Sequence, residues 1–180
     1  MTISESAKQG INLLFTRAAK TNLALSAGDH VEITPLPGNK LFAPPEKQIA
    51  VLTIASYLFR LLTIFHFTAD RATTTYFGRE NADTSFEEDF GEVGNLCCGA
   101  MNRDLHKHFL HLGMSTPDFL ASHCLPFLTE LKPGFISQHK ITINDSVSMH
   151  ATLCLCAYAP IDFRVDEAEA EDETGALEMF

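Results

Sequence analysis

A carboxylate and a carboxamide stand three residues apart in the run from Phe90 to Gly99. Residues at this spacing are neighbours on one face of a helix, so Glu92 and Asn95 would lie side by side. A carboxylate can bind a cationic group, and an amide can donate one hydrogen bond while accepting another. Together the two side chains could therefore fix a charged or polar partner group in one orientation.

Three glycines accompany this pair, although glycine destabilises a helix interior by roughly 0.5–1 kcal/mol relative to alanine. In a helical projection, Gly99 falls on the same side as Glu92 and Asn95, one turn beyond Asn95. We expect it to leave room for the backbone of another protein. Gly91 and Gly94 fall toward the flank, where close packing against a neighbouring element explains them.

The same projection divides the predicted helix into two faces. The apolar face is wide enough to seat the helix on a sheet and consists of Phe86, Phe90, Val93, Cys97, Ala100 and Met101. The opposite face consists of Glu88, Glu92, Asn95, Gly99 and Asn102. From this pattern alone, a solvated helix face is the simpler explanation of the polar residues.

The helix itself is predicted over 84–112. Capping-box patterns at Thr84-x-x-Glu87 and Ser85-x-x-Glu88 mark its start, and Gly113 is a natural stop. Two further helices are expected, at 4–25 and at 68–77, the latter stopped by Gly78.

Alternating apolar residues predict strands on both sides of this helix. We expect a strand at 30–33, two strands within 48–67 that turn near Ala55-Ser56, and a hairpin of 135–143 and 147–158. Pro117 and Pro126 bracket a loop with a short helix. Adjacent strand runs indicate a mostly antiparallel or mixed β-sheet covered by helices, which is an α+β fold.

Composition excludes several classes of partner. The chain has 180 residues, of which 46% are hydrophobic, and a net charge of −10, so nucleic acid and anionic membrane surfaces are not expected partners. No signal peptide or membrane span is evident, and the five cysteines lack metal-type spacing. We expect a cytoplasmic protein with reduced thiols, one folded domain over 1–163, and an acidic tail over 164–180.

The run Gly91-Glu92-Val93-Gly94-Asn95-Leu96-x-x-Gly99 resembles the active-site helix of the CheC/CheX family of chemotaxis phosphatases. The following His111-Leu112-Gly113 and Pro117 also fit the layout of that family. A single motif per chain matches the CheX branch, whereas CheC carries two. The resemblance implies a CheC-like fold with one long motif-bearing central helix.

The resemblance also implies a function, which is dephosphorylation of the phospho-aspartate of a CheY-like receiver domain in chemotaxis or another two-component system. Asn95 would orient the attacking water in line with phosphorus, and Glu92 would pair with a receiver lysine. Glu88, Gly99 and Asn102 would contact the partner. No cofactor of its own is implied, since the Mg²⁺ would belong to the receiver domain, and the protein would form a homodimer.

Other interpretations stay open at this point. Glu88 stands where family members often have Asp or Ser, which could alter docking, and a catalytically inactive adaptor of the same fold is the alternative function. A structural or motor-associated protein is a third possibility. His106, His108 and His111 could suggest a metal site, but a polar surface near a helix C-terminus explains them better, so no metal site is predicted.

Overall fold

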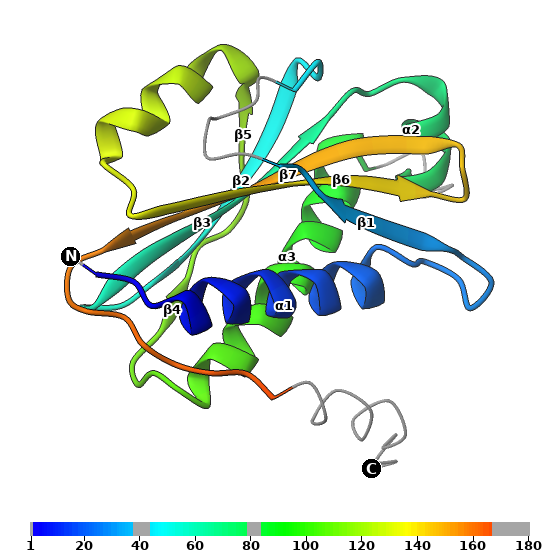
Figure 1. The fold of residues 1–180 in the computed structure, drawn as a ribbon. Helices are drawn as coiled ribbons and strands as arrows, with labels where there is room; N and C mark the ends of the chain where they lie inside the picture. The colour runs from blue at the N-terminus through cyan, green and yellow to red at the C-terminus, as the bar shows by residue number, and fades with distance from the viewer. Residues whose placement is uncertain (1, 38–43, 79–83, 167–180) are drawn as a thin grey trace.

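The computed structural model describes residues 2–37, 44–78 and 84–166. They form a seven-stranded antiparallel sheet covered on one face by α1 (Glu5–Asn22) and α3 (Phe86–His106) (Figure 1). The predicted α+β class is therefore confirmed. Most of the predicted acidic tail, residues 167–180, lies outside the described residues. Within the described residues, no helix combines the length and apolarity needed to cross a membrane.

The strand order is β1-β6-β7-β3-β2-β4, and β5 also pairs with β2. Every pair of neighbouring strands is antiparallel. The strands are β1 (Val31–Pro35), β2 (Gln48–Ala55), β3 (Phe59–Phe67), β4 (Gly113–Met114), β5 (Asp118–Ala121), β6 (Phe135–Ile143) and β7 (Val147–Ala157). The strand near 30–33 and both strand pairs are confirmed, whereas β4 and β5 were not predicted.

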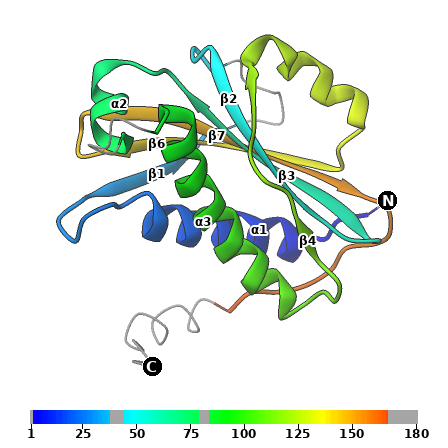
Figure 2. The same ribbon diagram turned by 180° about the vertical axis from the view of Figure 1, so that it is seen from behind.

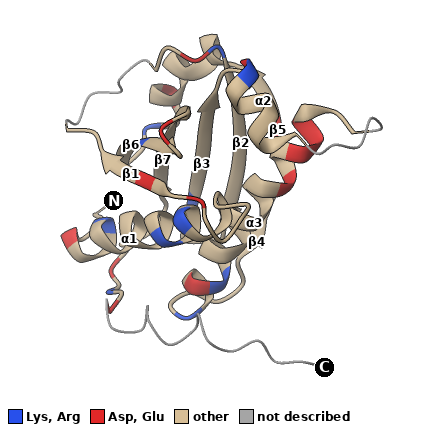
Figure 3. Cartoon of the chain, turned by 90° about the vertical axis from the view of Figure 1, so that its right-hand side faces the viewer, with Lys and Arg blue, Asp and Glu red and all other residues tan. Residues whose placement is uncertain are grey.

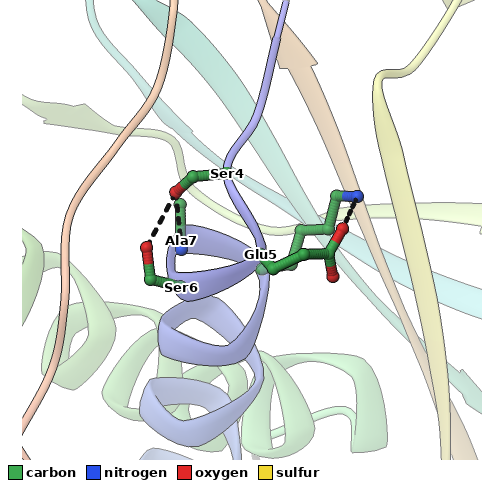
Figure 4. Close-up of polar contacts among 5 residues, drawn as sticks. Ser4, Glu5, Ser6 and Ala7 are labelled. Carbon is green, nitrogen blue, oxygen red and sulfur yellow. Dashed lines mark hydrogen bonds and ion pairs between the residues drawn. The ribbon is translucent and has the colours of Figure 1, made fainter.

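Local hydrogen bonds explain where the first two helices begin. The Ser4 side chain accepts a hydrogen bond from the Ala7 backbone N–H at 3.1 Å, and an ion pair of 2.6 Å joins Lys8 to Glu5 (Figure 4). The Asp70 side chain likewise caps α2 (Arg71–Phe77), which ends at Gly78 as predicted. Both helices thus start at a side chain that satisfies an otherwise unpaired backbone N–H.

The main core lies between the sheet and the helices α1 and α3. Alternate residues of β7 point into it, namely Val147, Met149, Ala151, Leu153 and Leu155. On α3, the ring of Phe90 contacts the rings of Phe65, Phe67 and Phe77 at centroid distances of 6.1, 4.7 and 5.0 Å. These aromatic contacts seat the N-terminal half of α3 on β3, with Glu87, Glu88 and Glu92 exposed to solvent and Asp89 buried.

A second, smaller core lies on the opposite face of the sheet, beneath the 3-10 helix η1 (Ser122–Leu131). Figure 2 shows η1 and α3 on opposite sides of the sheet. Leu125 and Leu128 of η1 pack there with Cys154 and Cys156 of β7. Buried polar groups continue this face, where His66 and Thr152 form a hydrogen bond of 2.8 Å.

The end of the central helix was predicted wrongly. α3 ends at His106 instead of 112, and Gly113 begins β4 instead of stopping the helix. The ring of Phe109, just beyond the helix, packs on Phe59 and Phe163 at centroid distances of 5.0 and 5.3 Å. These contacts come from distant parts of the chain and outweigh the local preference to continue the helix.

Candidate functional site

The start of α3 is fixed by a capping box between Ser85 and Glu88. The Glu88 N–H donates to Ser85 Oγ at 3.2 Å, and the Ser85 N–H donates to Glu88 Oε2 at 2.8 Å. Of the two predicted capping patterns, the structure therefore forms the second. Glu88 is exposed, as expected of a partner-binding residue, but one of its carboxylate oxygens already bonds its own helix.

Glu92 and Asn95 lie together on the outer side of α3. Glu92 is exposed, and Asn95 is half-buried. The Oδ1 atom of Asn95 is buried and accepts no hydrogen bond from any described residue, and Asn102 Oδ1 is in the same state. A buried acceptor left without a donor costs about 1–3 kcal/mol. Because this atom is closed to solvent in the present conformation, a water or a partner's donor could reach it only after the amide turns toward the groove.

The three glycines of the motif have different surroundings. A Cβ built on Gly91 would lie 3.2 Å from Pro117 Cγ, and one built on Gly94 would lie 3.3 Å from Leu52 Cδ1. Both glycines thus allow close packing, as predicted. At Gly99, the nearest atom to a built Cβ is Arg103 Nη1 at 3.8 Å, so the helix surface is open there.

A groove of about 620 Å³ runs beside the pair. α3 forms one wall, with Glu88, Glu92 and Asn95, and the segment entering β5 forms the other, with Pro117 and Phe119. Pro117 was predicted to follow the motif at the position expected from the resemblance. Phe119 was not predicted to line the groove. The structure thus adds an apolar wall to the predicted polar residues.

Acidic side chains dominate the first half of α3 (Figure 3). Its first turn carries Glu87, Glu88 and Asp89, and Glu92 follows, whereas its last turn combines Arg103 and His106 with Asp104. The acidic first turn matches the helix dipole. A phosphoryl group approaching the acidic half would be repelled unless a cation accompanied it. The site therefore suits a partner that brings a positive group with its anion.

Two residues on this face were missed by the sequence analysis. Leu96 is 58% exposed, and Arg103 is also exposed. The helical projection could have identified both, because Leu96 follows Glu92 by four residues and Arg103 follows Gly99 by four. The predicted site contained only polar residues and glycines of this face, so it omitted the apolar Leu96 and the basic Arg103.

The described cysteines and histidines near α3 do not form a metal site. Among residues 2–37, 44–78 and 84–166, no cluster of three or more His, Cys, Asp or Glu side chains could hold a metal ion. Cys97 is buried on the apolar stripe, as predicted, and Cys98 is buried beside it. Burial raises the pKa of both thiols, that of Cys98 to about 12. His108 lies against the ring of Phe163 at a centroid distance of 4.9 Å.

Solved structures share this fold. The chemotaxis protein CheX from Vibrio vulnificus superposes with a TM-score of 0.58 at 13% identity, over 81% of this chain and 99% of that chain. A CheX structure from Borrelia burgdorferi, solved as a CheX–CheY–BeF3–Mg²⁺ complex, gives a TM-score of 0.57 at 14% identity, over 82% and 96%. No protein-family model and no curated protein matches the sequence.

The chain has the CheC/CheX fold. The resemblance found in the sequence is thereby confirmed at the level of the fold. The middle domain of FliM from Vibrio alginolyticus also superposes, with a TM-score of 0.50 at 11% identity, over 81% of this chain and 91% of that chain. Because a fold does not by itself imply a function, the function must be argued from the residues on α3.

Proposed function

We propose that this protein is a phosphatase that hydrolyses the phospho-aspartate of a CheY-like receiver domain in chemotaxis or another two-component pathway. The observation that carries the proposal is that Glu92 and Asn95 are neighbours on the outer side of α3, within a CheC/CheX fold. The complex of a CheX with CheY from Borrelia burgdorferi supports a receiver domain as the partner.

The reaction needs little chemistry from the phosphatase itself. An acyl phosphate is already activated, so positioning a water molecule in line with phosphorus is most of the task. The water oxygen forms the new bond to phosphorus while the bond from phosphorus to the aspartate oxygen breaks. Inorganic phosphate leaves, and the aspartate carboxylate is restored.

Asn95 is the residue that would orient this water. Its Oδ1 atom is buried and has no donor among the described residues, so turning the amide toward the partner breaks no hydrogen bond of that atom and would let it accept one from the water. Glu92 would pair with a lysine of the receiver domain and hold the two proteins in register. The Mg²⁺ belongs to the receiver domain, and we propose no cofactor for the phosphatase itself.

The other predicted contacts fit this role in different ways. Gly99 leaves space for the partner, and Asn102 has an unused Oδ1 acceptor on the same helix. Glu88 would contact the partner while one of its oxygens bonds Ser85. We also propose a cytoplasmic homodimer that pairs through a sheet edge. Strand β1 is a candidate for this edge, because among the described strands it pairs with β6 on one side.

The test measures phosphate release from a panel of phosphorylated receiver domains. The parent protein should accelerate release from at least one of them, and Asn95→Ala should remove about 10²–10³-fold of the acceleration, as expected for a lost transition-state contact. Asn22→Ala, at the C-terminal end of α1, is a control of the same residue type outside the residues that line the groove. Equal acceleration by the parent and by Asn95→Ala would refute the mechanism.

A receiver-binding adaptor without catalytic activity is the second candidate. The capping box favours this candidate. One carboxylate oxygen of Glu88 accepts a hydrogen bond from its own helix, so Glu88 is less available to a partner in the groove. An adaptor would bind a receiver domain activated with beryllofluoride, yet leave the rate of phosphate loss from the phosphorylated form unchanged.

A further inference from the structure

An exposed leucine interrupts the polar face of α3. Leu96 is 58% exposed, whereas Phe90, Cys97 and Met101 on the same helix are fully buried. Leu96 lies four residues after Glu92 and three before Gly99, so all three share one stripe of the helix surface. Most of the leucine side chain contributes nothing to the core of this chain and is available to a partner.

Next to this leucine the helix surface has a notch. A Cβ built on Gly99 would have one heavy-atom neighbour within 4 Å, the Nη1 atom of Arg103 at 3.8 Å. Arg103 is exposed, and none of the described residues forms an ion pair or hydrogen bond with its side chain. The guanidinium group beside the notch therefore has unused hydrogen-bond donors.

The stripe thus runs from an acidic residue through an apolar one and a notch to a basic one. Glu92 and Arg103 are eleven residues apart, which corresponds to about 16 Å along a helix. A patch along a stripe of this length is smaller than the roughly 800 Å² that each partner buries in a standard interface, so it would form one part of the contact. An apolar centre with a charged rim is the usual composition of such interfaces.

We propose that Leu96 and Arg103, on either side of the notch at Gly99, form the docking surface that selects the receiver domain. This inference rests on the proposed function, since a receiver whose lysine pairs with Glu92 would lie beside Leu96, one turn further along the same stripe. The receiver would present a cation to Glu92, an apolar side chain to Leu96 and an acidic side chain to Arg103. The opposite charges at the two ends fix the direction in which the partner lies along α3.

The test separates docking from catalysis. Leu96→Ala and Arg103→Glu are compared with the parent, using a receiver domain that the parent binds after activation with beryllofluoride. Each variant should weaken binding, measured by calorimetry, about tenfold. In phosphate-release assays each should raise KM by a similar factor and leave kcat unchanged, because Asn95 is not altered. Only a docking role predicts this division between KM and kcat.

Two matched controls lie on the other side of the sheet. Leu131→Ala removes an exposed leucine from η1, and Arg60→Glu reverses an exposed arginine of β3 that pairs in register with Cys156. Both should bind the receiver as the parent does. Thermal unfolding of all four variants checks that the fold is retained.

The outcomes distinguish the two proposals. If Leu96→Ala and Arg103→Glu keep the parental Kd and KM, the docking surface is wrong, even when Asn95→Ala shows the phosphatase proposal to be right. If binding depends on Leu96 and Arg103 but no receiver loses phosphate faster, the docking surface stands and the phosphatase proposal fails. If no activated receiver binds the parent, the docking surface is refuted.

Discussion

Gly91 of α3 and Pro117 of the segment that enters β5 approach each other closely, since a Cβ built on Gly91 would be only 3.2 Å from Pro117 Cγ. The same built atom would be 3.5 Å from the ring of Phe119. This contact sets the distance between the two walls of the groove beside Glu92 and Asn95. The glycine is thus required for packing, and the packing in turn shapes the site.

A larger side chain at Gly91 should destabilise the protein. We expect Gly91→Val to lower the free energy of unfolding by about 1–3 kcal/mol, because a rigid proline and an aromatic ring occupy the space it needs. Urea unfolding followed by circular dichroism measures this. A variant as stable as the parent would show that the segment near Pro117 yields easily.

The opposite result is expected at Gly99. Gly99→Ala should raise the free energy of unfolding by about 0.5–1 kcal/mol, since alanine favours the helix and the nearest neighbour is the flexible end of Arg103. The same variant should bind an activated receiver less tightly, because the added methyl group fills the notch. Greater stability with unchanged receiver affinity would contradict the role given to Gly99.

Removal of the α3 cap should cost stability. Ser85→Ala eliminates the acceptor for the Glu88 N–H, and we expect the free energy of unfolding to fall by about 0.5–2 kcal/mol. Ser148→Ala, at an exposed position of β7, is the matched control and should change it by less than about 0.5 kcal/mol. Equal effects of the two substitutions would rule out a capping contribution.

Two buried histidines should make the fold sensitive to mild acid. Desolvation by burial lowers the pKa of His66 and of His139 to about 4, and the neighbouring His150 adds to the effect at His66. The unfolded chain, with histidine pKa values near about 6.5, binds protons that the folded chain excludes. Stability is therefore complete above about pH 6.5 and falls toward pH 4, by about 1.4 kcal/mol per pH unit for each histidine.

Urea unfolding between pH 7.5 and pH 5 tests this dependence. His66→Gln and His139→Gln should each reduce the slope of stability against pH, and the double variant should remove most of it. These substitutions retain a polar group at sites where His66 bonds Thr152 and His139 packs on Phe15. An unchanged slope in the double variant would assign the acid sensitivity to other groups.

Thiol reactivity should differ sharply among the five cysteines. Cys97, Cys98, Cys154 and Cys156 are buried, and desolvation raises the pKa of each thiol, whereas Cys124 is half-buried. Since the thiolate is the reactive form, Ellman's reagent at pH 8 should label Cys124 first. Cys124→Ser should show no fast-reacting thiol in the folded protein, while urea should expose the remaining four.

Periodic patterns explain what could be predicted. The alternation of Val147, Met149 and Ala151 requires one buried face of a strand, and the structure places all three in the main core. The turn at Asn144 and Asp145 has φ values of 50° and 54°, which are typical of the tight hairpin that these residue types predicted. Such features depend on neighbours in the sequence and need no knowledge of distant contacts.

Pairing between distant segments explains what could not be predicted. β4 and β5 hydrogen-bond to β2 across more than fifty residues of chain, and neither short segment has a strong strand pattern of its own. The end of α3 at His106 likewise follows from the packing of Phe109 on Phe59 and Phe163. Non-local apolar contacts and backbone pairing override weak local preferences in both cases.

For the candidate site, the sequence by itself determined that Glu92 and Asn95 share the outer face of α3, because the helical period fixes which side chains are neighbours. Only the tertiary structure decided that a groove opens on the flank of Asn95, since Pro117 and Phe119 pack against Gly91 from a separate segment. The helical period places Leu96 on the same side as Glu92, but only the tertiary structure decided that no other segment covers it. A side chain is buried or exposed according to what packs over it, and that depends on the whole chain.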